Sequence, residues 1–189
     1  MRAIGSYCKG NGHFTYPFGG VAFDGEGNLV VCDSGNHRIQ VFRYSDGTHL
    51  RSIGSYGAGN GQFGGGDSGV AFDSEGNLVV ADFYNHCVQV LRYSDGAHVR
   101  TIGSRGAGAG QFDYPTGVAF DAAGHIVVVE FGNHRMQVLR YSDGTHVRTI
   151  GSRGSGNGQF NSPAGGIAID SDGRIVVADS SNHRVQVLE

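Results

Sequence analysis

Short apolar runs separated by polar turns recur along the chain, and helix signals are absent. In one stretch, the runs are residues 69–73 (GVAFD), 78–81 (LVVA), 88–91 (VQVL) and 98–102 (HVRTI). Runs of this length that are rich in Val, Ile and Phe and bounded by Gly, Asn, Asp and Ser are typical of β-strands. The pattern predicts four short strands here, and the fourth, more polar strand is expected at a sheet edge.

Turn signals lie between these runs. Residues 74–77 (SEGN) and 82–85 (DFYN) separate the first three strands, and the Asp-Gly pair at 95–96 favours a tight hairpin before the fourth. A glycine-rich stretch, residues 103–111, then crosses to the next unit. Glycine makes up 34 of the 189 residues, and it brackets strands where positive φ is needed. The glycine content therefore indicates turns and not disorder.

The same unit occurs four times. One phenylalanine recurs at spacings of 49, 49 and 48 residues, as Phe14, Phe63, Phe112 and Phe160. Such a period means a repeat architecture, and four short antiparallel strands per unit of ~40–50 residues form a β-propeller blade. We predict an all-β chain, a single β-propeller domain over residues 1–189. Its four repeats are about 14–62, 63–111, 112–159, and 160–189 together with 1–13.

The ends of the chain are offset with respect to this unit. Residues 2–5 (RAIG) align with the fourth-strand residues 100–103 (RTIG), and residues 185–188 (VQVL) are a third strand. We expect Arg2 to Gly5 to complete the last blade beside Val185 to Leu188, in the same chain or a neighbouring one. The higher effective concentration favours a single-chain ring, with a narrow channel lined by four glycines. These are Gly20, Gly69, Gly117 and Gly166. The alternative is a strand-exchanged homo-oligomer, in which two chains form eight blades.

The repeats resemble the NHL repeat family. The third copy carries the motifs at 115–121 (PTGVAFD), 124–130 (GHIVVVE) and 133–138 (NHRMQV), and the fourth copy is closest at 167–170, 173–179 and 182–187. The resemblance implies a propeller of NHL-type four-stranded blades, usually six per ring. Members serve mostly as protein-binding modules. Some bind RNA through a basic face, and another branch resembles zinc-using peptidyl-hydroxyglycine lyases.

Charge and composition limit the classes of partner that the sequence predicts. The net charge of −3 disfavours a broad nucleic-acid footprint. No apolar run reaches 18 residues, which predicts no membrane-spanning helix, and the first residues lack the apolar stretch of a signal peptide. The three cysteines occupy non-equivalent repeat positions, so we expect free thiols and a reducing, cytoplasmic compartment.

Histidines and aspartates recur by blade. One histidine series is His37, His86, His134 and His183, and each member is expected to bond its own blade's turn and to lie far from the others. The aspartates at strand ends are expected to satisfy turn backbone groups. The sequence has no nucleophile-elbow, His-Glu-x-x-His or phosphate-loop motif. We therefore expect no enzyme activity, catalytic residue, metal site or cofactor.

Differences between the copies are the signal for binding. The crossings between blades and the turns between the second and third strands are expected on one face, which propellers commonly use for binding. Exposed aromatics and arginines are enriched at interaction hot spots. The candidate binding residues are Tyr7, Tyr56, Arg105 and Arg153 in the crossings, and Phe83, Tyr84 and Phe131 in the turns.

The leading hypothesis is a non-catalytic interaction scaffold that binds a protein or peptide through this face. One alternative is an RNA-binding NHL module, which the net charge disfavours. A zinc-dependent lyase is another, and an engineered or fragment repeat assembly with no native ligand is the last.

Overall fold

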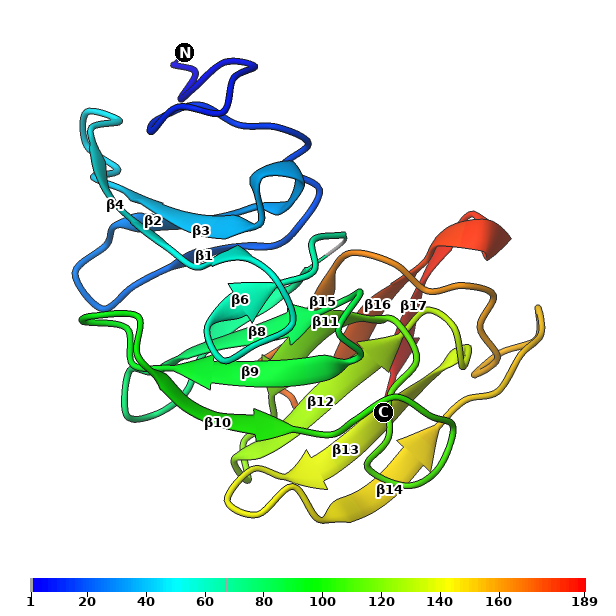
Figure 1. Ribbon diagram of the computed structural model, residues 1–189. Helices are drawn as coiled ribbons and strands as arrows, with labels where there is room; N and C mark the ends of the chain where they lie inside the picture. The colour runs from blue at the N-terminus through cyan, green and yellow to red at the C-terminus, as the bar shows by residue number, and fades with distance from the viewer. Residues whose placement is uncertain (1, 67) are drawn as a thin grey trace.

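The computed structural model describes residues 2–66 and 68–189, which form four antiparallel sheets (Figure 1). We name the sheets blades 1 to 4. Blade 1 consists of β1 (Val21–Phe23), β2 (Leu29–Asp33), β3 (Arg38–Phe42) and β4 (His49–Ile53). Blade 2 consists of β7 (Val70–Phe72), β8 (Leu78–Asp82), β9 (Cys87–Leu91) and β10 (His98–Ile102). Blade 3 consists of β11 (Pro115–Phe120), β12 (His125–Glu130), β13 (Arg135–Arg140) and β14 (His146–Ile150). Blade 4 consists of β15 (Ile167–Ile169), β16 (Ile175–Asp179) and β17 (Arg184–Leu188).

Within each blade, strands pair in chain order, so the predicted all-β propeller architecture is confirmed. The remaining elements are the short parallel pair β5 (Ser55–Tyr56) and β6 (Gln62–Phe63) and the single 3-10 turns η1 (Ser34–Asn36) and η2 (Ser180–Asn182). Among the described residues, no helix is long and apolar enough to cross a membrane. The cysteines Cys8, Cys32 and Cys87 are free thiols, as expected.

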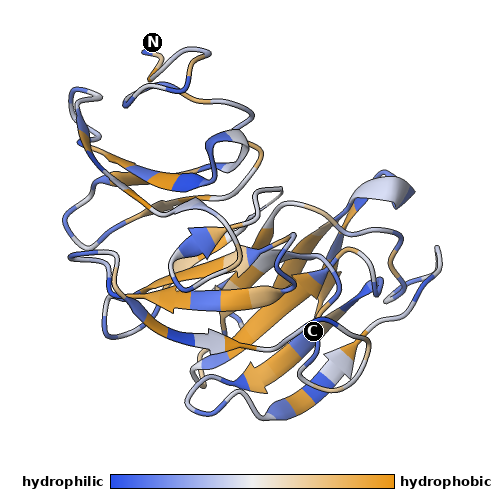
Figure 2. Cartoon of the chain, viewed as in Figure 1, coloured by the Kyte–Doolittle hydropathy of each residue, from blue (hydrophilic) through white to orange (hydrophobic). Residues whose placement is uncertain are grey.

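Apolar side chains are buried between blades. Three clusters fill the interfaces between blades 1 and 2, 2 and 3, and 3 and 4. Figure 2 shows apolar strand centres and polar turns at the ends of the blades. The continuous apolar runs of the second strands follow from this arrangement, because a strand inside a stack of blades is covered on both faces.

A glycine after each fourth strand provides the seat for the repeated phenylalanine. Gly103 has φ +78, and a Cβ atom built on it would lie 2.3 Å from the Phe112 ring. Gly54 and Gly151 make the same contact with Phe63 and Phe160. Because the site combines a positive φ with ring contact, any larger side chain is excluded.

The axis is lined by small residues. A cavity of 390 Å³ is lined by the four predicted glycines, Gly20, Gly69, Gly117 and Gly166, among other residues. The predicted lining is therefore confirmed. Gly69 and Gly117 approach so closely that a Cβ on Gly69 would lie 2.7 Å from the Gly117 Cα atom.

The predicted closure by the N-terminal strand is wrong for the single chain. Blade 4 has three strands, and within the described residues no fourth strand pairs with β17. Residues 2–5 lie against blade 1 instead, where the Arg2 guanidinium donates to the Tyr44 and Ser45 carbonyls. In Figure 1, blade 1 and blade 4 lie at the two ends of the row of blades. The β3–β4 hairpin therefore positions the N-terminal segment, and the edge of β17 is left free.

A buried carboxylate at the end of each second strand holds the blade together. The Asp33 side chain, 0% exposed, accepts hydrogen bonds from the Thr15 backbone N–H and from Asn36, Arg38 and Gln40. Glu130 has the same partners in blade 3 and Asp179 in blade 4. The recurrent Asn, Arg and Gln of the repeat motif are thus ligands of a structural carboxylate.

Blade 2 lacks one member of this network. Asp82 accepts from the Gly64 N–H, Asn85 and Gln89, but Cys87 stands where the other blades have arginine. Burial raises the Asp82 pKa, and the hydrogen bonds offset this in part. A cavity of 280 Å³ lined by Cys87, Asn85 and Gly59 lies at the corresponding place. Asp82 is therefore a buried carboxylate without the cation that its counterparts have.

We expect Gly103→Ala to lower the free energy of unfolding by about 2 kcal/mol or more, because it forces an L side chain to positive φ against the Phe112 ring. Gly25→Ala is the control. A Cβ atom on Gly25 would meet open space, so this substitution should change the free energy of unfolding little. Urea denaturation measures both. Equal stabilities of the two variants would contradict the packing argument.

We expect Cys87→Arg to raise the free energy of unfolding by about 1–2 kcal/mol, since the guanidinium would fill the cavity and pair with Asp82. Cys87→Met is the matched control, which adds volume without charge. Thermal and urea unfolding at neutral pH measure the difference. A gain in Cys87→Met that equals the gain in Cys87→Arg would show that filling, and not pairing, stabilises this site.

Candidate functional site

The crossings and the turns between second and third strands lie at the same end of the blades, as predicted; we call this end the loop face. The Asn85 side chain in a turn donates to the Gly57 carbonyl in a crossing, with 2.9 Å between N and O. The Tyr56 ring of the same crossing lies edge-on to His37, with 4.6 Å between ring centroids. The two segments thus support each other, and the strands behind them fix their position.

An aromatic cluster lies on the loop face over blades 2 and 3. The Phe83 ring lies 5.0 Å from Tyr84, 4.7 Å from Tyr114 and 6.1 Å from Phe131, measured between centroids. Tyr84 is 58% exposed, and Phe83, Tyr114 and Phe131 are half-buried. The structure therefore brings together three of the predicted binding residues, Phe83, Tyr84 and Phe131, in one surface with an exposed apolar rim.

Tyr114 is a member of this cluster that the sequence analysis did not single out. It has φ +51 and precedes Pro115, and its backbone N–H donates to Nδ1 of His86 at 3.2 Å. Its ring lies 4.5 Å from the His86 ring. The recurrence of a residue before proline, as in Tyr16-Pro17 and Ser162-Pro163, is the signal that could have indicated this position.

The crossing residues lie elsewhere on the loop face. Tyr7 and Tyr56 are 82% and 73% exposed, and Arg105 and Arg153 are exposed. Among the described residues, none of the four makes an aromatic or cation–π contact with the cluster. Arg105 is nonetheless close enough to His86 for its charge to act on that ring. These residues are therefore distributed one per blade and form no single patch.

Two of the repeated histidines, His86 and His134, link neighbouring blades, which corrects the prediction that each bonds its own turn. Nδ1 of His37 is buried and has no hydrogen-bond partner among the described residues. His134 Nδ1 accepts the Ser162 backbone N–H at 2.9 Å, and His86 likewise accepts from Tyr114 in the following blade. Each histidine has φ near +55 at the end of its turn, and this conformation points the ring across the interface. Burial lowers the pKa of His134, and the nearby Arg153 lowers it further. The same cause lowers the pKa of His86, against an opposing effect of Asp113.

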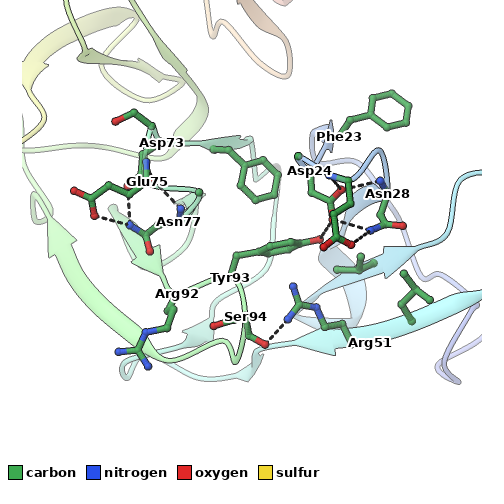
Figure 3. A pocket seen from close by; sticks show the side chains of 17 residues that line it. Phe23, Asp24, Asn28, Arg51, Asp73, Glu75, Asn77, Arg92, Tyr93 and Ser94 are labelled. Carbon is green, nitrogen blue, oxygen red and sulfur yellow. Dashed lines mark hydrogen bonds between the residues drawn. The ribbon is translucent and has the colours of Figure 1, made fainter.

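A groove of 840 Å³ opens between blades 1 and 2 at the opposite end, where the sequence indicated no site. Figure 3 shows Tyr93 reaching from blade 2 to Asp24 of blade 1, where its hydroxyl donates at 2.8 Å. The Arg51 guanidinium lies 4.1 Å from the Tyr93 ring centroid and donates to the Ser94 carbonyl. Burial raises the pKa of Tyr93 to about 12, so the phenol stays protonated.

The acidic groups of this groove are already bonded. Asp24 accepts from the backbone N–H groups of Glu26 and Asn28 and from the Asn28 side chain, and Asp73 repeats this pattern. Among residues 2–66 and 68–189, no group of three His, Cys, Asp or Glu side chains is placed to hold a metal ion. The groove is therefore built as an interblade joint, repeated by Tyr141 and Asp73 between blades 2 and 3.

We expect stability to fall as the pH drops from about 7.5 to about 5, because the unfolded chain takes up protons that His134 and His86 resist in the fold. When folding lowers the pKa of a histidine, the stability is fully present at a pH above the pKa of the unfolded chain. It is lost as the pH falls from that pKa through the lower pKa of the folded protein. His134→Gln should reduce the pH slope of the melting temperature. An unchanged slope in that variant would contradict the assigned hydrogen bond.

Solved structures share the fold at low identity. Virginiamycin B lyase from Staphylococcus aureus, as an inactive variant with quinupristin, matches with a TM-score of 0.62 and 14% identity over 89% of this chain and 51% of that chain. Kuenenia stuttgartiensis hydrazine synthase matches with a TM-score of 0.61 and 15% identity over 97% of this chain and 53% of that chain. A Bacteroides thetaiotaomicron protein of unknown function matches with a TM-score of 0.70 and 20% identity over 88% of this chain and 45% of that chain. The chain spans about half the length of these proteins.

The family comparison covers every blade. The sequence matches no curated protein. The NHL repeat model matches residues 19–42, 68–91, 112–139 and 160–188, which contain nearly all of the first three strands of each blade. Together with the observed sheets, these matches show that the chain belongs to the NHL repeat family.

Proposed function

We propose that the chain is a non-catalytic interaction scaffold that binds a protein or peptide through its loop face. The observation that carries the proposal is the aromatic cluster of Phe83, Tyr84, Tyr114 and Phe131. Aromatic side chains supply large contact areas at low entropic cost, and tyrosine adds a hydroxyl for directional bonding. A partially exposed cluster on rigid blades therefore offers a preorganised anchor for an apolar or aromatic side chain of a partner.

The polar groups around the cluster support binding without chemistry. Glu130 is fully buried and is occupied by Arg135, Gln137 and Asn133. His86 is held by the Tyr114 backbone N–H, and Asp113 lies 3.2 Å from the same ring nitrogen. A general acid or base needs a free side chain that reaches substrate. The virginiamycin B lyase among the structural neighbours is 14% identical to this chain, a level that indicates a shared fold and not a shared activity.

A displayed library of random peptides, selected on the protein, tests this proposal. We expect enriched peptides to lose at least about tenfold in affinity for Tyr84→Ala and for Phe131→Ala, as hot-spot truncations do. Val99→Ala is the matched control, because Val99 is 48% exposed on the outer strand β10, away from the cluster. Peptides that bind Tyr84→Ala and the parent protein equally would overturn the assignment.

The same variants separate a peptide site from an RNA site. Single-stranded RNA oligonucleotides should bind weakly, because the chain carries a net charge of −3. Tight RNA binding that falls steeply with added salt and is lost in Arg105→Ala and Arg153→Ala would instead favour the RNA-binding alternative.

A further inference from the structure

The two outer faces of the row of blades are unpartnered versions of its internal interfaces. On β17 of blade 4, Val185 and Val187 are 64% and 60% exposed, whereas the equivalent Val88 and Val90 on β9 are 0% and 1% exposed. On β1 of blade 1, Val21 is 64% exposed, and its equivalent in blade 3, Val118, is 5% exposed. The same side chains are thus core between blades and surface at the ends.

The open faces of blades 4 and 1 carry the same residue types as the two faces that pack together between blades 2 and 3. Blade 2 presents five small apolar residues to blade 3: Ala71, Val79, Ala81, Val88 and Val90. The corresponding residues on the open face of blade 4 are identical in type: Ala168, Val176, Ala178, Val185 and Val187.

The receiving side is also repeated. In the interface between blades 2 and 3, these five residues pack with Ile102 at the end of β10, with Phe112 in the crossing, and with residues of blade 3. The blade 3 residues are Val118, Phe120, Ile126, Val128, Leu139 and Tyr141. The open face of blade 1 has Ile4, Phe14, Val21, Phe23, Leu29, Val31, Phe42 and Tyr44 at these positions. Six of the eight pairs are identical in residue type. The open face of blade 1 is therefore built to receive the open face of blade 4.

The N-terminal segment already lies where a fourth strand of a preceding blade would lie. Arg51 and Arg100, on the fourth strands of blades 1 and 2, each stack on a tyrosine of the following blade, at 4.1 and 4.2 Å from the ring centroid. Arg2 stacks in the same way on Tyr44, at 5.5 Å. Among residues 2–66 and 68–189, the segment has no third strand on its other side, and β17 is a third strand with no fourth strand beside it.

Polar groups at the open faces are equivalent to groups that form hydrogen bonds between blades inside the row. Between blades, the Tyr93 hydroxyl donates to Asp24 and the Tyr141 hydroxyl to Asp73. The equivalent pair is Tyr44 and Asp170, at opposite ends of the chain. His183 of blade 4 is the counterpart of His134, which accepts a backbone N–H of the following blade; blade 1 offers the N–H of Tyr16. Among the residues that the structure describes, the Tyr44 hydroxyl and the His183 ring form no hydrogen bond. Nδ1 of His37, at the internal interface of blades 1 and 2, has no partner either, so Tyr44 is the group specific to the open face.

We propose that two copies of this chain close one ring, each inserting its residues 2–5 as the fourth strand beside β17 of the other. Rings of four to eight blades are known, so two chains of four blades reach the upper end of that range and three chains would exceed it. The chain also superposes on about half the length of larger solved chains with TM-scores of 0.60 to 0.70, as expected if its four blades form half of a ring. Head-to-tail contacts of this kind close when the rotation permits.

The mass in solution tests this proposal directly. Light scattering at tens of micromolar should give twice the chain mass of 19.9 kDa. Val185→Glu combined with Val187→Glu should halve the measured mass, because both positions are exposed in the single chain and buried in the ring. Val99→Glu with Val147→Glu is the matched control on the outer strands, at 48% and 47% exposure, and should keep the doubled mass. A parent protein of single-chain mass, or a series of larger masses, would overturn the proposal.

A disulfide trap identifies the strands that meet. In blades 1 to 3, Ile39 faces Ile53, Val88 faces Ile102, and Met136 faces Ile150. The same register places Val185 opposite Ile4 of the second copy. In a Cys8→Ser background, Ile4→Cys with Val185→Cys should form a covalent dimer on oxidation, and Ile4→Cys with Val99→Cys should not. A link within one chain would instead establish the single-chain ring.

Discussion

Each blade depends on a buried carboxylate at the end of its second strand. Asp33, Glu130 and Asp179 are completely buried, and each is tied to a backbone N–H of the incoming crossing and to Asn, Arg and Gln side chains of the following turn and strand. A charge taken out of water is tolerated only when its hydrogen-bonding capacity is satisfied. The carboxylate therefore fixes the crossing, the turn and the third strand relative to one another. Glu130 preserves the arrangement with one more methylene group.

This constraint separates the parts of the repeat that are fixed from those that vary. The Asn, Arg and Gln ligands face inward, so the residues just before them in the turn are free to differ. Phe83 and Tyr84 in blade 2 and Phe131 in blade 3 occupy these positions. Blade 1 has a serine and a glycine there, and blade 4 has two serines. The aromatic cluster can thus change without disturbing the scaffold. Blade 2 tolerates the loss of its arginine, yet it retains a cavity and a carboxylate whose pKa is raised by burial.

Repetition also determines the interfaces. Because each blade presents one apolar face forward and another backward, a row of blades always ends in two complementary faces. Propellers avoid this by closing into a ring. The exposed valines on β1 and β17, together with the N-terminal segment seated on blade 1, are what remains when the four blades of one chain do not close.

The sequence determined the local structure almost completely. The apolar runs, turn residues and period located the strands of blade 2 to within one or two residues, because short strands bounded by Gly, Asn and Asp have few alternatives. The recurring phenylalanine likewise set the period and the approximate bounds of the four repeats. Three of the residues in the aromatic cluster were predicted from differences between the copies.

Tertiary structure decided the rest. Tyr114 joins the cluster because its backbone, at positive φ, is held by a histidine of the neighbouring blade, and no local pattern encodes that contact. His86 and His134 bond across interfaces for the same reason. The position of residues 2–5 depends on the rotation between neighbouring blades. Small differences in interface packing change this rotation, and the changes add up over four blades. A sequence repeat specifies which faces match, but the angle at which they meet decides which copy of the face is within reach.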